Sequence, residues 1–320
     1  MKSYNCFYSA LFDVLEPSYQ KNTSLLINNR WQFFYNTNKN YSDDRRILGE
    51  YPLLFDSFHL EQLYDIYNIQ IQLIKVKNGF NELSEYIQRD GHVIVFANKH
   101  VLSGLYKTSQ EGRCVTTIKI DNFKRNNINY SVFDSNMPTL KNDISIIKNA
   151  WTDASDYPFL NKSIIKISIG EIKNCDEAAK VFFWNSLKNS IKNYMNGLTE
   201  KQIINGYKGL NAFASALCDW DQITPQKLID CSMYIEFIIK QRESIRTVLE
   251  YVCSQPHYNK KINSVNSVIE LWKKVKMFFF IVGKREQYES IKFISDQVRV
   301  VSDMEYACLT DLMKIAGDNI

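Results

Sequence analysis

A cysteine near the start of the chain, Cys6, has the setting best suited to chemistry. It comes directly before an apolar segment in which Phe7, Ala10, Leu11 and Val14 follow helical spacing. A thiol at a helix N-terminus faces unpaired backbone N–H groups and the positive end of the helix dipole, and both lower its pKa. The same N–H groups can bind an oxyanion. Cys6 is therefore a candidate nucleophile, and the alternative interpretation is a small buried thiol.

A cysteine nucleophile needs a base, usually histidine, and a carboxylate or amide group that orients this base. Asp134 ends a predicted strand and is a candidate orienter, although the Asp-Ser-Asn sequence that it begins also predicts a turn. Of the four histidines, His100 lies two residues after Asn98, at the end of another predicted strand. His100 could share a strand face with Asn98 and serve as the base. His92, at the start of that strand, is a second candidate.

Several other classes of function are not indicated. With 11 glycines the chain has no dinucleotide-binding or P-loop motif, and its four histidines have no metal-ligand spacing. A metal site made of carboxylates alone stays open. The 39 Lys and Arg against 35 Asp and Glu give a charge of +4 without a basic stripe, which argues against nucleic acid. Seven scattered cysteines without a C-x-x-C pair argue against a disulfide framework or a structural zinc site.

The first half of the chain, residues 1–160, combines helical and strand patterns. Helical spacing covers residues 7–15, where Pro17 is expected to end the helix, and also residues 59–67 and 81–88. Apolar runs predict strands at residues 69–74, 92–97, 114–120 and 128–134, and a polar turn joins the last two as a hairpin. Helix followed by clustered strands favours an α+β domain over a repeating βαβ sheet.

The second half, residues 161–320, is almost purely helical from residue 175 onward. Gly197 is expected to end one helix, and Thr224-Pro225 to begin another. The aromatic run at residues 278–280 predicts core packing. The longest apolar run, residues 277–283, is far shorter than the roughly 20 residues of a membrane span. Since no secretory signal is recognisable either, we expect a cytoplasmic protein with domains at 1–160 and 161–320.

Several motifs follow one another along nearly the whole chain. In chain order they are Asn5-Cys6-Phe-Tyr-Ser-Ala-Leu, Arg30-Trp31-Gln-Phe-Phe-Tyr35, residues 91–98, 102–106, 130–134 and 209–220, Glu270-Leu-Trp272, and the segment that begins Glu305-Tyr-Ala-Cys. Together these motifs resemble the butirosin biosynthesis protein H family. The resemblance implies a papain-like fold of the bacteriocin-processing cysteine-peptidase type at residues 1–160. A helical domain would follow at 161–320.

The resemblance also implies an activity. Proteins of this family accept an acyl group from an acyl carrier protein thioester and pass it to an amine, in aminoglycoside, nonribosomal-peptide and polyketide pathways. Carried over, Cys6 would accept the acyl group and Asp134 would act as the orienter. The expected partners are an acyl carrier protein and a small-molecule amine, with no cofactor, metal, membrane or nucleic acid. A Lys/Arg cluster at residues 273–276 and 284–285 predicts a solvated helix face, or alternatively a docking site for an acidic carrier protein.

One position departs from the family pattern. The family's histidine begins the strand before the Asp-ending strand, where this sequence has Arg113 and Cys114. Arginine cannot accept a proton at neutral pH, and an unactivated thiol is a poor base. Three interpretations stay open. In the first, His100 or His92 acts as the base in place of the family's histidine. In the second, acyl transfer proceeds without a histidine. In the third, the chain is noncatalytic and binds a carrier protein or another enzyme. Peptidase or amidase activity is less favoured, because amide cleavage needs the acid that a histidine would supply.

Overall fold

The computed structural model describes most of the chain and divides it into two compact units. The described residues are 6–19, 22–37, 47–48, 63–64, 67–98, 101–102, 115–124, 127–132, 144–152, 161–170, 176–197, 199–200, 202–220, 223–253 and 258–318. The helical unit comprises residues 21–56 and 175–320, and the sheet unit comprises residues 2–20 and 57–174. This division differs from the predicted domains in two segments, because residues 21–56 group with the helical unit and residues 161–174 with the sheet unit.

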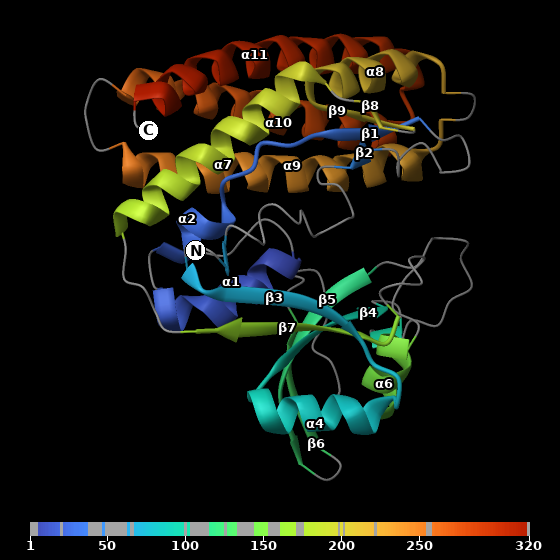
Figure 1. Cartoon of the computed structure of the whole chain (residues 1–320). Coiled ribbons are helices and arrows are strands. Elements are labelled where there is room, and N and C mark those ends of the chain that lie inside the picture. The colour runs from blue at the N-terminus through green and yellow to red at the C-terminus, as the bar shows by residue number, and fades with distance from the viewer. Residues whose placement is uncertain are drawn as a thin grey trace. The chain divides into compact units, whose positions relative to one another are not determined.

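A five-stranded antiparallel sheet organises the sheet unit (Figure 1). Its strand order is β3 (Ile69–Lys75), β7 (Ser163–Ile169), β4 (Val93–Asn98), β5 (Val115–Lys124) and β6 (Asn127–Val132). β5 and β6 form the predicted hairpin. β7 pairs with both β3 and β4, which explains why residues beyond 160 belong to this unit. The predicted α+β class is confirmed.

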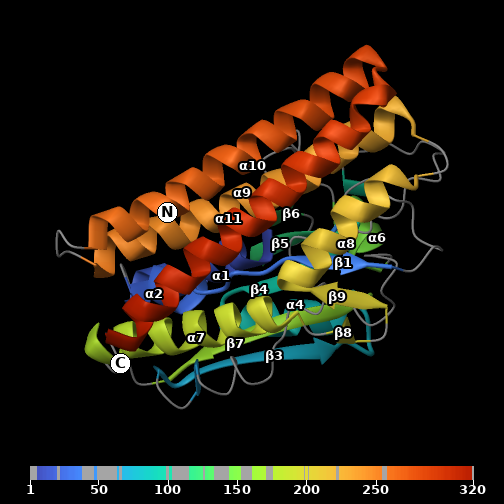
Figure 2. The ribbon, with the colours of Figure 1, turned by 90° about the horizontal axis from the view of Figure 1, so that it is seen from above.

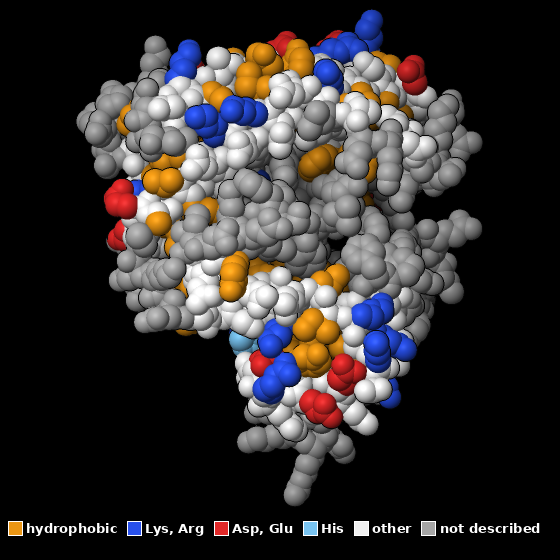
Figure 3. Space-filling model, viewed as in Figure 1, with side chains coloured by type: hydrophobic (Ala, Val, Ile, Leu, Met, Phe, Trp, Pro, Cys, Tyr) orange, Lys and Arg blue, Asp and Glu red, His pale blue; other side chains and the backbone are white. Residues whose placement is uncertain are grey.

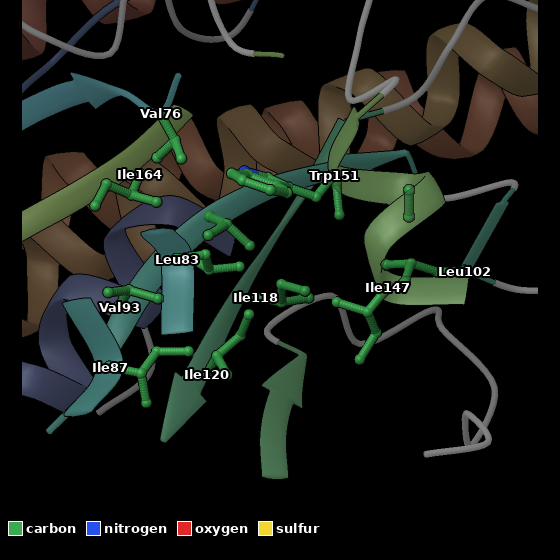
Figure 4. Packing of buried hydrophobic residues seen from close by; sticks show 13 residues of the cluster. Val76, Leu83, Ile87, Val93, Leu102, Ile118, Ile120, Ile147, Trp151 and Ile164 are labelled. Carbon is green, nitrogen blue, oxygen red and sulfur yellow. The ribbon is translucent and has the colours of Figure 1, made fainter. Parts of the chain in front are cut away.

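Helices α4 (Phe80–Asp90) and α6 (Ile144–Thr152) cover one face of this sheet (Figure 4). Alternate strand residues point to the same face, and here they are apolar and buried. The cluster includes Val93, Val95 and Ala97 of β4, Ile118 and Ile120 of β5, Leu83 and Ile87 of α4, and Ile147 and Trp151 of α6. The Trp151 indole N–H donates to the Ser163 carbonyl oxygen at 3.0 Å, so its one polar group is also satisfied.

Helix α1 (Cys6–Tyr19) covers the opposite face. Its Phe7 ring stacks on Phe96 of β4, with ring centroids 6.2 Å apart. The helix continues through Pro17 to Tyr19, so the prediction that Pro17 ends it is wrong. A proline inside a helix removes one backbone hydrogen bond. The Tyr19 hydroxyl donates to the Tyr67 carbonyl oxygen at 2.9 Å, and this buried bond holds the last turn in place.

Long helices and a small sheet build the helical unit. The antiparallel sheet has the order β2 (Ile47–Leu48), β1 (Phe34–Asn36), β9 (Ile203–Asn205) and β8 (Thr199–Glu200). The helices are α2 (Asn22–Ile27), α7 (Asp176–Asn196), α8 (Gly206–Cys218), α9 (Pro225–Val252), α10 (Asn259–Arg285), the 3-10 turn η3 (Tyr288–Ser290) and α11 (Ile291–Asp318). α10 packs along α9 and α11 (Figure 2). Because β1 lies between β2 and β9, an early segment of the chain is internal to this unit.

A buried carboxylate ties this early segment to the helices. Glu305 of α11 is fully buried and accepts hydrogen bonds from four side chains. The donors are Trp31 Nε1 (3.3 Å), the Tyr194 hydroxyl, Arg242 Nε (3.0 Å) and Nη2 (3.3 Å), and Trp272 Nε1 (2.8 Å). The Arg242 guanidinium also lies 4.4 Å from the centroid of the Trp31 ring. We call this set of residues the Glu305 network.

Helix boundaries in this unit follow several of the sequence signals. Thr224 caps α9 by accepting a hydrogen bond from the Lys227 backbone N–H at 3.3 Å, and α7 ends just before Gly197. The aromatic run matches its prediction only in part, because Phe279 is fully buried and Phe280 is 45% exposed. Of the helices that the structure describes, none is both long and apolar enough to cross a membrane.

Candidate active site

The start of α1 lies at a defined end of the β4–β5 strand pair. Phe7 contacts Phe96, near the end of β4. Asp13, further along α1, forms an ion pair with Lys119 of β5, and Lys119 lies opposite Ile94, near the start of β4. α1 and β4 therefore run in opposite directions. Cys6 comes one residue before Phe7, so the helix begins where β4 ends.

A buried amide side chain occupies this end of β4. Asn98 is the last residue of the strand, is 5% exposed, and shares the α1-facing side with Phe96 because strand side chains alternate. Its Oδ1 accepts a hydrogen bond from the Val101 backbone N–H at 3.3 Å. Val115 is its partner in β5. A polar residue that ends an otherwise apolar strand is a sequence signal for such a position.

Most of the predicted site residues lie outside the part of the chain that the structure describes. This holds for Asp134 and His100, and also for Arg113 and Cys114. For Cys6 the structure describes the backbone, as the first residue of α1. The roles given to these side chains therefore stay predictions.

The strands that flank these positions end on the same side of the sheet. β5 begins at Val115, directly after position 114, and β6 ends at Val132, two residues before position 134. Val132 is opposite Ile118, three residues into β5. The start of β5, the end of β6 and the end of β4 therefore lie at the same end of the sheet, and α1 begins at this end.

His92 lies at the other end of β4, which contradicts its interpretation as a base for Cys6. From His92 to Phe96 the chain rises by about 13 Å at 3.3 Å per strand residue. Burial lowers the pKa of His92, and the positive charge of Lys119 adds to this effect. The carboxylates of Asp121, Asp90 and Asp13 oppose it. His92 is thus a neutral side chain near the middle of α1 and away from its start.

Buried cysteines of the helical unit are unsuited to nucleophilic chemistry. Cys231 is fully buried, and burial raises the pKa of Cys253 to about 11 and that of Cys308 to about 12. These two thiols stay protonated at neutral pH, whereas a nucleophile must be a thiolate. Cys218, at the end of α8, is exposed.

The Lys/Arg cluster on α10 is partly neutralised by α9 and by α10 itself. Lys273 pairs with Glu243 and Glu270, each at 3.1 Å, and Lys276 pairs with Glu236 at 2.6 Å. A similar mixture of charges is visible on the sheet unit in Figure 3, where Lys and Arg side chains lie beside Asp and Glu side chains. These pairs favour the solvated helix face over a docking site for an acidic partner.

No group of three His, Cys, Asp or Glu side chains that could hold a metal ion occurs among the described residues. Comparison with known proteins adds no family. No protein-family model matches the chain, and no curated protein matches its sequence.

Proposed function

We propose that the protein is a cysteine-dependent acyltransferase with a papain-like sheet unit. The observation that carries this proposal is the placement of α1. A helix that starts at Cys6 lies on an antiparallel sheet. It begins at the end of the sheet where β4 and β6 end and β5 starts. In the sequence, positions 113–114 directly precede β5 and position 134 follows the end of β6 by two residues, and these are the positions where the resembled family has its histidine and aspartate.

The proposed reaction has two steps. The Cys6 thiolate attacks the carbonyl carbon of a carrier-bound thioester, a new carbon–sulfur bond forms, and the carrier thiolate leaves and takes up a proton. An amine then attacks the Cys6 thioester, which forms an amide and releases Cys6. The amine proton passes to the departing sulfur. The positive end of the α1 dipole would stabilise both the thiolate and the oxyanion.

Transfer without a histidine near Cys6 is chemically reasonable. Of the four histidines, the structure describes His92, which lies too far from the start of α1. A thioester is more reactive than an amide, and a neutral amine is already a nucleophile. The reaction therefore makes a smaller demand on general acid–base catalysis than peptide hydrolysis does.

The biological setting comes from the resemblance alone. It is natural-product biosynthesis, with an acyl carrier protein as donor and a small-molecule amine as acceptor. Because Lys273 and Lys276 of α10 are paired with carboxylates, we assign no docking site for the carrier to that helix.

Intact-mass spectrometry with an acetyl-loaded carrier protein tests the function. Wild type is expected to gain one acetyl group, and Cys6→Ala none. Cys218→Ala is the matched control, because it removes an exposed thiol of the other unit and should acetylate like wild type. A wild type that never gains mass, or a Cys6→Ala variant that gains it equally, refutes the proposal.

A noncatalytic binding protein is the second candidate. The placement of His92 favours it, since this removes one of the two candidate bases. It predicts that carrier binding survives Cys6→Ala and that iodoacetamide modifies Cys6 no faster than an ordinary thiol. Rapid alkylation of Cys6 below pH 7 argues for the enzyme instead.

A further inference from the structure

We propose that β3 pairs antiparallel with β3 of a second copy of this chain, which joins two sheet units into one continuous sheet. The inference concerns an interaction surface and does not depend on the proposed function. β3 is an outermost strand of the five-stranded sheet (Figure 1), and among the described strands it pairs with β7 alone. Its other edge is therefore a place where a further strand can add by backbone hydrogen bonds.

Two hydrogen bonds show which backbone groups of β3 point away from β7. The Gly170 N–H donates to the Asn68 carbonyl oxygen at 2.9 Å, and the Val76 N–H donates to the Lys162 carbonyl oxygen, also at 2.9 Å. Residues of an antiparallel strand alternate between those that bond to one neighbour and those that face the other side. Even-numbered residues of β3 therefore bond to β7, and the backbone groups of the odd-numbered residues point to the outer edge.

The edge of β3 lacks the features that commonly protect a strand edge from pairing. Such edges are often very short, bulged, or interrupted by proline or charge. β3 has seven residues in continuous register with β7, and the sequence Ile-Gln-Ile-Gln-Leu-Ile-Lys has no proline and no charge before its last residue. The edge strand on the opposite side, β6, differs because its register with β5 shifts between Ile120 and Asn122. Of the two edges, β3 is the one open to regular pairing.

An apolar row of the sheet ends at an exposed leucine on β3. Leu73 is 37% exposed, although its direct partner in β7, Ile165, and its neighbour on the same strand face, Ile71, are both buried. Gln70 and Gln72, on the opposite face of the strand, are exposed as well. A neighbouring strand that places an apolar side chain beside Leu73 would continue the row.

The sequence of β3 suits pairing with itself. A two-fold axis at Gln72, the midpoint of the strand, uses all seven residues and pairs odd-numbered residues with odd-numbered ones, as the outward backbone groups require. Ile71 then lies opposite Leu73 of the second copy and covers it. The two Gln72 side chains face each other, and two amides can hydrogen-bond to one another. Lys75 lies opposite Ile69, so no like charges meet.

Engineered cysteines test the contact and its register in the full chain. In the pair centred at Gln72, the two Cα atoms at position 72 lie about 4.5 Å apart, within the range of a disulfide. Those at position 70 lie more than about 13 Å apart, because they are offset by four residues. With the exposed Cys218 replaced by alanine, oxidised glutathione should link Gln72→Cys into a covalent dimer and leave Gln70→Cys monomeric.

Gln70→Cys is the matched control, because it replaces an exposed glutamine on the same strand face. Equal linking of the two variants, or no linking of Gln72→Cys, would overturn the proposed pairing.

Analytical ultracentrifugation measures the association without a covalent link. Wild type should form dimers with a dissociation constant of about 1–100 µM, since a single strand pair is a small interface. Leu73→Glu should raise this constant at least about tenfold, because the two-fold axis brings the two carboxylates within about 8 Å of each other. Leu73→Lys should do the same, and a mixture of the two variants should dimerise again.

Ser131→Glu is the control for added charge, because it lies at an exposed position on the opposite edge strand, β6, and it should match wild type. A wild type that stays monomeric at about 500 µM, above the range expected for so small an interface, contradicts the proposal. So does a Leu73→Glu variant that dimerises like wild type.

Discussion

Replacing Glu305 by Gln tests how the helical unit is held together. Glu305 and Arg242 are both 0% exposed and lie 3.0 Å apart. Removing one partner of a buried ion pair costs about 3–5 kcal/mol, because the remaining charge stays buried without compensation. Glutamine also replaces one acceptor oxygen by an NH2 group, which then faces N–H donors such as Trp31 Nε1. We expect a loss of about 4 kcal/mol, a large share of the usual 5–15 kcal/mol of a folded domain.

The assay is urea unfolding followed by circular dichroism and tryptophan fluorescence. Glu250→Gln is the control, because the Glu250 side chain is 48% exposed and lies 3.6 Å from Arg246. Such surface pairs contribute at most about 1 kcal/mol, and we expect a loss below about 0.5 kcal/mol for this variant. A loss below about 1 kcal/mol for Glu305→Gln would refute the reasoning.

A double substitution, Arg242→Met with Glu305→Met, extends the test. An isolated buried ion pair can often be replaced by apolar residues with little loss. In the Glu305 network, three further donors would lose their acceptor, and each costs about 1–3 kcal/mol. The double variant should therefore remain clearly less stable than wild type, and wild-type stability would show that these donors contribute nothing.

Three further predictions concern single residues. Gly206→Ala should cost clearly more than Gly91→Ala when both are measured by thermal unfolding, because both have positive φ but a Cβ at Gly206 would lie 2.0 Å from a backbone oxygen; equal losses would contradict this. In native protein at pH 8, iodoacetamide should leave Cys253 and Cys308 unmodified, since their raised pKa values keep them as thiols until about pH 11, and peptide mapping checks this. Thr224→Ala should destabilise α9 by about 1 kcal/mol in urea unfolding, and no loss would show that the cap is not used.

Local patterns predicted the elements better than their grouping. The compact apolar run after His92 is β4, and Thr224-Pro225 begins α9, because both signals act within a few residues. Pro17 was misleading because a contact with distant Tyr67 holds the last turn of α1. The grouping of residues 21–56 with the helices depends on contacts such as Trp31 with Glu305, 274 residues apart, which no local pattern encodes.

For the candidate site, the sequence indicated that a helix begins at Cys6, but it did not indicate which end of β4 lies beside the helix start. The apolar spacing after Cys6 indicates where α1 begins. It cannot indicate which end of β4 the helix start approaches, because this depends on packing of Phe7 against Phe96. That contact separates His92 from the start of α1 and brings Asn98 to it.

The central position of β1 has a consequence for how the chain folds during synthesis. Trp31 leaves the ribosome early, but its acceptor Glu305 follows 274 residues later. The β9 strand that pairs with β1 is also made much later, at Ile203–Asn205. Residues 22–36 therefore lack these partners, and their apolar side chains stay exposed, while the intervening sheet unit is synthesised. Long-range pairing of this kind folds slowly, so this segment is where a chaperone would be expected to bind the nascent chain.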